Sequence, residues 1–127
     1  MLLKKSELID NQQIQITGSK SISNRLLILH QLFENILIEN LSNSQYTQLL
    51  QAALQSDSDI IDIHHAGTAM RFLTSYYAIQ EGKTVILTGS DRMKQRPIKF
   101  LVDALRDLGA EISYLENEGF PPLKITG

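Results

Sequence analysis

Residues 18–25 read GSKSISNR and mark the point where a strand pattern gives way to a helix pattern. Before them, isoleucines alternate with polar residues, which predicts a strand over residues 13–17. After them, apolar residues recur at helical spacing and predict a helix over residues 21–33. Either Ser19 or Ser21 can cap that helix.

The two patterns continue to alternate along the rest of the chain. Strands are predicted at 36–41, 59–63, 83–88, 112–114 and 123–125, and helices at 44–55, 67–81 and 97–109. A turn at residues 119–122 joins the last two strands. The resulting order, β-α-β-α-β-α-β-α-β-β, predicts a mixed α/β (α+β) fold.

Composition limits the class of protein. The 127 residues are 43% hydrophobic and carry a net charge of −2, which argues against disorder and against general nucleic-acid binding. The chain has no cysteine, so disulfides and thiolate metal sites are excluded. No apolar run approaches the roughly 20 residues that a membrane span needs. We therefore expect a soluble, cytoplasmic protein with no membrane partner.

Three segments place glycine, hydroxyl side chains and a cation at a predicted helix start: residues 18–25, 66–71 and 87–97. A helix amino terminus offers unpaired N–H groups and a partial positive charge, and so favours an anion. Glycine lets an oxyanion approach the backbone, hydroxyls donate hydrogen bonds, and lysine or arginine supplies a full charge. The sequence therefore predicts binding of anionic ligands at these helix starts.

Spacing within the segments supports this prediction. Ser21 and Arg25 are four residues apart and share a helix face, so a phosphate there could meet both side chains and Lys20. Gly67 and Arg71 have the same spacing. The third segment brings Arg92, Lys94 and Arg96 together, and the three segments hold half of the 12 Lys and Arg residues. Such clustering is unfavourable unless an anion or acidic neighbours compensate it.

Each segment taken alone also has an ordinary interpretation. Residues 18–25 can be a capped surface helix, and residues 92–96 a solvated loop. The P-loop spacing G-x-x-x-x-G-K-[ST] is absent, which argues against nucleotide hydrolysis. His64 and His65 have no metal-ligand partners at suitable spacing, so we expect no metal site.

Taken together, GSKSISNR, AGTAMR and LTG-x-x-RMK-x-RP resemble the 5-enolpyruvylshikimate-3-phosphate synthase family in both order and spacing. The resemblance runs from about residue 13 onward and includes the Pro-Pro of residues 117–123. It implies a fold of repeated β-α-β-α-β-β units, of which residues 13–127 form part of the N-terminal domain. It also implies that residues 1–12 are an N-terminal strand segment, which in the family belongs with a second domain.

The resemblance implies a carboxyvinyl transferase of the shikimate pathway, which leads to aromatic amino acids. In the family, the 5-hydroxyl of shikimate 3-phosphate attacks the enol carbon of phosphoenolpyruvate, the methylene carbon is protonated, and phosphate leaves. The reaction requires no metal and no organic cofactor. Both substrates are anions, in agreement with the helix starts described above.

The resemblance also implies roles for individual residues. Lys20 matches a lysine near both substrates, and Ser21 and Arg25 match ligands of the shikimate phosphate. Gly67 and Arg92 match a glycine beside phosphoenolpyruvate and an arginine that binds it. Three further motif positions are expected to support the site: Thr68, Arg71 and Arg96.

Two positions and one short stretch depart from the family pattern. The family usually has Asn where His65 stands and Pro where Phe72 stands. Phe72 is expected to change the packing behind Gly67, on which the inhibitor glyphosate depends. The acidic stretch usual after the second strand is replaced by Ser-Asn-Ser-Gln at residues 42–45.

The resemblance covers only the first part of the family's two-domain chain. The remaining phosphate-binding serines, the acid/base carboxylates and further cationic groups belong to the missing C-terminal part. We therefore expect this chain alone to be inactive. Alternatives are the related UDP-N-acetylglucosamine enolpyruvyl transferase, a stand-alone anion-binding module, and a truncated product without a role.

Overall fold

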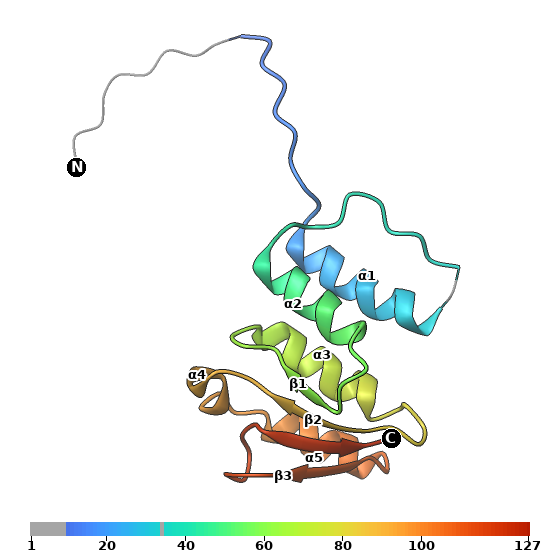
Figure 1. The fold of residues 1–127 in the computed structure, drawn as a ribbon, viewed down its shortest axis with the longest axis vertical. Helices are drawn as coiled ribbons and strands as arrows, with labels where there is room; N and C mark the ends of the chain where they lie inside the picture. Colours follow the sequence, from blue (N-terminus) through green and yellow to red (C-terminus); the bar gives the residue numbers. More distant parts are fainter. Residues whose placement is uncertain (1–9, 34) are drawn as a thin grey trace, which may run out of the picture.

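The computed structural model describes residues 10–33 and 35–127. Its elements are α1 (Lys20–Leu32), α2 (Gln45–Leu54), β1 (Ile60–Asp62), α3 (Gly67–Tyr77), β2 (Thr84–Thr88), α4 (Asp91–Lys94), α5 (Lys99–Asp107), β3 (Glu111–Tyr114) and β4 (Leu123–Thr126). Helices α1 and α2 lie side by side at one end, and the sheet lies at the other with α3 between them (Figure 1).

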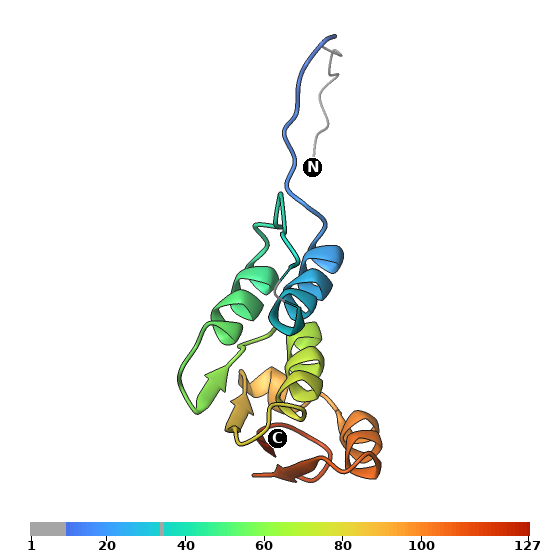
Figure 2. The same cartoon turned by 90° about the vertical axis from the view of Figure 1, so that its right-hand side faces the viewer.

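The four strands form one mixed sheet in the order β1-β2-β4-β3. Strands β1 and β2 are parallel, because α3 carries the chain back between them, and the other pairs are antiparallel. Alternate residues such as Ile61, Leu87 and Ile125 are buried. This alternation places one face of the sheet against α3 and α5, as the turned view in Figure 2 shows.

The predicted order β-α-β-α-β-β is confirmed by the run β1-α3-β2-α5-β3-β4, with the single turn of α4 inserted before α5. Helix α3 is the centre of the core, because it contacts both the sheet and the α1–α2 pair. Its Met70, Leu73 and Tyr77 are almost completely buried. The Tyr77 hydroxyl donates to the Ala53 carbonyl oxygen at 3.1 Å and thereby joins α3 to α2.

Helices α1 and α2 are held together by buried polar groups. Thr47 Oγ1 donates to Asn24 Oδ1 at 2.8 Å, and the Ser42 N–H donates to Ser23 Oγ at 3.0 Å. All four residues are buried. A buried hydrogen bond is costly to break because it leaves unsatisfied groups, so these bonds fix the start of α1 against the start of α2.

The predicted strands over 13–17 and 36–41 are wrong. Residues 13–17 alternate in sequence and residues 36–41 read ILIENL, but in the described residues neither segment has a neighbouring strand with which to form a ladder. A weak hydrogen bond of 3.5 Å from Asn40 Nδ2 to the Ile16 carbonyl oxygen joins them instead. Ile14 and Ile16 are 83% and 75% exposed, so the alternation of residues 13–17 has no core to face, whereas Ile38 and Leu41 pack partly against the core without forming a strand. The predicted N-terminal strand segment falls mostly on residues 1–9, outside the described residues.

Two helix boundaries also differ from prediction. The helix predicted from Pro97 begins at Lys99, and its N-cap Ile98 donates its N–H to the Gly119 carbonyl oxygen at 2.8 Å. The residues before it form the one-turn α4, which was not predicted. Helix α3 ends at Tyr77, four residues before the predicted end, and leads into turns before Gly82, whose φ is +75°.

Candidate anion-binding site

Side chains from three elements meet near the start of α3. Lys20, the first residue of α1, places its Nζ 4.7 Å from the centroid of the Tyr46 ring, in the first turn of α2. The Tyr46 ring meets the His65 ring edge to face, with 5.0 Å between centroids. His65 lies directly before the start of α3 at Gly67. The first two predicted segments are thus joined through Tyr46.

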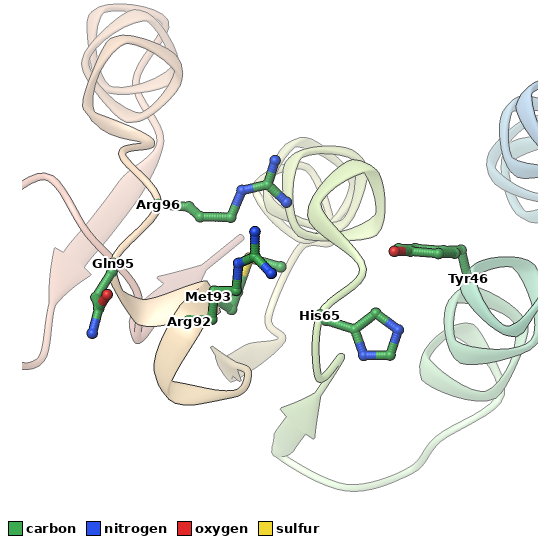
Figure 3. A pocket seen from close by; sticks show the side chains of 6 residues that line it. All are labelled: Tyr46, His65, Arg92, Met93, Gln95 and Arg96. Atoms are coloured by element: carbon green, nitrogen blue, oxygen red, sulfur yellow. The ribbon is translucent and has the colours of Figure 1, made fainter. Parts of the chain in front are cut away.

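Residues of the third segment, 87–97, approach the start of α3 from the side opposite Tyr46 and His65. The guanidinium groups of Arg92 and Arg96 both point toward the first turn of α3, with His65 and Tyr46 opposite them (Figure 3). A Cβ added at Gly67 would collide with Arg96 Nη1. Glycine at the start of α3 therefore allows the Arg96 guanidinium to lie against the backbone.

These side chains enclose an open cavity of about 520 Å³, lined by Tyr46, His65, Arg92, Met93, Gln95 and Arg96. The two charged side chains that line it, Arg92 and Arg96, are both cationic. Of the predicted site residues, Arg92 and Arg96 line the cavity, whereas Lys20 and Gly67 border it through Tyr46, His65 and Arg96.

Ser21 and Arg25 do not line this cavity. Arg25 Nη1 donates to Ser21 Oγ and to the Ser21 carbonyl oxygen, both at 2.8 Å, so the predicted shared helix face is confirmed. The Arg25 guanidinium also lies 5.8 Å from the Phe72 ring centroid of α3. Arg25 thus borders the α1–α3 junction, a little more than one turn along α1 from Lys20.

Arg71 and Thr68 lie on α3 itself. Arg71 Nη1 donates to the Gly67 carbonyl oxygen and Nη2 donates to the Pro97 carbonyl oxygen, each at 3.0 Å. The guanidinium therefore ties the start of α3 to the segment that carries Arg96. Thr68 is exposed in the first turn. The role of both residues as supports of a ligand site stays a prediction.

Among the described residues, the cations of the site have no carboxylate partner, as is also true of Lys83 and Lys124 outside it, whereas Lys94 of the third segment has one. Lys94 Nζ lies 2.6 Å from Glu116 Oε1, and this hydrogen bond raises the pKa of Lys94. Within residues 10–33 and 35–127, no carboxylate forms an ion pair with Lys20, Arg25, Arg92 or Arg96. Acidic neighbours thus compensate Lys94, and the four other charges remain available to an anion.

The helix starts also differ in their capping: Ser90 caps α4 of the third segment, and α5, outside the site, has no side-chain cap. The predicted side-chain cap of α1 does not form, because its N-cap Ser19 makes no side-chain hydrogen bond, and the N-cap of α3, Ala66, has no side chain able to accept one. By contrast, Ser44 Oγ caps α2 by accepting from the Thr47 N–H at 3.3 Å. The Gly67 N–H donates to the His65 carbonyl oxygen at 3.0 Å, so the free donors of α3 follow Gly67.

Sequence reasoning missed Tyr46 and did not assign His65 to the site. The signal for Tyr46 was its place in the first turn of α2, close to the polar segment at residues 42–45, but only the packing of α2 on α1 brings it to Lys20. In the described part of the chain, no group of three or more His, Cys, Asp and Glu side chains could hold a metal ion. Nor does that part contain a helix long and apolar enough to cross a membrane.

Comparisons with known proteins agree with these features. The family described as EPSP synthase (3-phosphoshikimate 1-carboxyvinyltransferase) matches residues 31–127. The 3-phosphoshikimate 1-carboxyvinyltransferase of Bacteroides fragilis strain YCH46 is 54% identical over 115 residues, which are 90% of this chain and 28% of that protein. The enzyme of the same name from Photobacterium profundum is 38% identical, over 92% of this chain and 33% of that protein.

A solved structure of EPSP synthase from Acinetobacter baumannii has the same fold, with a TM-score of 0.74 at 20% identity, over 90% of this chain and 31% of that one. The chain thus spans about a third or less of the length of the relatives it matches. Because the family match covers most of the sequence, this chain belongs to the EPSP synthase family.

Proposed function

We propose that this chain supplies the first part of the active site of a 3-phosphoshikimate 1-carboxyvinyltransferase. The observation that carries the proposal is the meeting of Lys20, Arg92 and Arg96 around the uncapped start of α3. In the described residues these cations have no carboxylate partners. Such an arrangement suits a small, multiply charged anion.

In the proposed reaction, the 5-hydroxyl oxygen of shikimate 3-phosphate bonds to the enol carbon of phosphoenolpyruvate, and the methylene carbon gains a proton. The hydroxyl proton is lost in this addition, which leaves a tetrahedral intermediate. The new methyl group then loses a proton as the carbon–oxygen bond to phosphate breaks, which gives the enolpyruvyl ether and free phosphate. The residues of this chain bind and orient the two anions. Ser21 and Arg25 hold the shikimate phosphate, Arg92 and the start of α3 hold phosphoenolpyruvate, and Lys20 lies between them.

The proton transfers need acid and base groups, and we assign these to the remaining part of the enzyme, a partner without which the site is incomplete. Acceleration requires all these groups to be held in register around the reacting atoms. The isolated chain is therefore expected to produce no phosphate from the two substrates above background in a coupled assay. Turnover by the purified chain would contradict this division of roles. The cytoplasmic location stays a prediction from the sequence.

The proposal is tested by titrating the isotopically labelled chain with each substrate and following backbone NMR signals. Shikimate 3-phosphate should move signals of residues 20–25, and phosphoenolpyruvate should move those of residues 65–69 and 92–96. Equal responses to inorganic phosphate and to shikimate 3-phosphate would favour a general anion-binding module instead. Responses confined to other surfaces would contradict the assignment of the site.

A further inference from the structure

Tyr46 is held in place by its buried neighbours. The first turn of α2 is capped by Ser44, and Thr47 in the same turn donates a buried hydrogen bond of 2.8 Å to Asn24 of α1. The backbone that carries Tyr46 is therefore fixed with respect to α1. The side chain itself is 36% exposed and extends into the cavity wall, with its hydroxyl toward the start of α3 (Figure 3).

The Tyr46 ring has a cation on one side and an imidazole on another. Lys20 Nζ lies 4.7 Å from its centroid, within the range in which an aromatic face attracts an ammonium group. The His65 ring meets it at an interplanar angle of 85°. Because His65 is joined to the start of α3, the ring connects the cation of α1 with the helix start that lines the cavity.

Lys20 needs such a contact more than an arginine would. Its side chain is flexible and ends in a compact, strongly hydrated charge, and no carboxylate of the described residues holds it. A cation that is ordered before the ligand arrives loses less conformational freedom when the ligand binds. An aromatic face can order an ammonium without neutralising its charge.

We propose that Tyr46 is a positioning residue, whose ring holds the Lys20 ammonium group beside the anion site at the start of α3. The inference rests on the proposed function, because it assigns to Tyr46 a role in the binding of the same anions. The ring rather than the hydroxyl carries the role, since the contact with Lys20 is made to the ring.

The first test concerns the ligand-free chain and does not depend on any activity. In the 127-residue chain, ring current from Tyr46 should shift the Lys20 side-chain methylene signals upfield in the ¹H–¹³C NMR spectrum. Tyr46→Phe should keep this shift and Tyr46→Leu should abolish it, with the rest of the spectrum showing that both variants fold. Unchanged Lys20 signals in Tyr46→Leu would overturn the inference.

The second test measures affinity for inorganic phosphate by NMR titration. Tyr46→Leu should weaken binding by about two- to five-fold, the range for an exposed cation–π contact, and Tyr46→Phe should leave it unchanged. The double variant Lys20→Ala/Tyr46→Leu should bind no more weakly than Lys20→Ala, because Tyr46 acts through Lys20. The matched control is Tyr114→Leu, which removes the ring that lies 5.0 Å from Arg106 outside the site and should leave phosphate affinity unchanged.

The outcomes separate this inference from the proposed function. If Lys20→Ala weakens binding and Tyr46→Leu does not, the positioning role is wrong and the site stands. If Tyr46→Phe loses as much affinity as Tyr46→Leu, the hydroxyl is responsible and the inference is overturned. If Lys20→Ala itself has no effect, the assignment of Lys20 to the site fails, and the role of Tyr46 in binding fails with it.

Discussion

At Gly67, the absence of a side chain lets Arg96 lie against the first turn of α3. Gly67→Ala should displace the flexible guanidinium end and leave the backbone intact, since alanine is well tolerated at a helix start. In the full-length enzyme we expect affinity for phosphoenolpyruvate to fall about tenfold, equivalent to about 1.4 kcal/mol. Calorimetry measures this loss, and thermal unfolding should show a midpoint that is not lowered.

A double variant identifies the cause of that loss. If Gly67→Ala acts by moving Arg96, then Gly67→Ala/Arg96→Ala should bind phosphoenolpyruvate no more weakly than Arg96→Ala alone. Strictly additive losses would show that the methyl group obstructs the ligand directly.

Arg25 offers a second prediction at the scale of one residue. Its guanidinium already bonds Ser21 Oγ at 2.8 Å, so both groups are placed for a phosphate at the start of α1. Arg25→Ala in the full-length enzyme should weaken shikimate 3-phosphate binding by about 1.5–3 kcal/mol, the range for a charge-assisted hydrogen bond. The matched control is Lys124→Ala, an exposed cation on β4, which should leave the calorimetric affinity unchanged.

At the scale of elements, the helix caps make a paired prediction. Ser44 Oγ accepts from the Thr47 N–H at 3.3 Å, whereas Ser19, at the same position before α1, makes no side-chain cap bond. Ser44→Ala should lower the free energy of unfolding by about 1 kcal/mol, and Ser19→Ala should lower it clearly less. Urea unfolding followed by circular dichroism measures both. Equal losses would show that the site-facing start of α1 is capped after all.

Sequence periodicity predicted the strands correctly wherever each strand had a neighbouring strand to pair with. Strands β1, β2, β3 and β4 appear close to their predicted positions because each has a ladder partner. The segment at 13–17 alternates regularly and the segment at 36–41 reads ILIENL, yet neither forms a strand. A strand is stabilised by pairing across the sheet, which the alternation of one segment cannot reveal.

For the molecule as a whole, burial of Tyr77 makes the free energy of unfolding fall at high pH. Desolvation, with a smaller contribution from Tyr76, raises the pKa of Tyr77 from 10.0 to about 12. The neutral phenol is thus favoured in the folded state. Its contribution to stability is complete below pH 10, where both states are protonated, and is lost as the pH rises from 10 toward about 12. We expect a loss on the order of 2–3 kcal/mol over this range.

Urea unfolding at several pH values between neutrality and strong alkali checks this expectation. Tyr77→Phe removes the ionisable group and should flatten the alkaline decline, although it also removes one of the donors to the Ala53 carbonyl oxygen, which still accepts from the Ser56 N–H at 3.3 Å. A weaker slope should remain, because burial also raises the pKa of Tyr76 and of Tyr114. The same slope in Tyr77→Phe as in the unchanged chain would contradict the assignment to Tyr77.

The sequence by itself determined the mixed α/β class, the β-α-β-α-β-β run and the cation-bearing starts of α1 and α3, whereas the cations of the third segment lie in or just after α4, which was not predicted. These features depend on periodicity and on the chemistry of short segments, which are local. Only the tertiary structure decided that Tyr46 and His65 join Lys20 to the start of α3, that Glu116 takes Lys94 out of the cationic group, and that Ser21 and Arg25 lie outside the cavity. Each of these contacts joins residues from different elements, and the packing that brings them together is a property of the whole core rather than of any one segment.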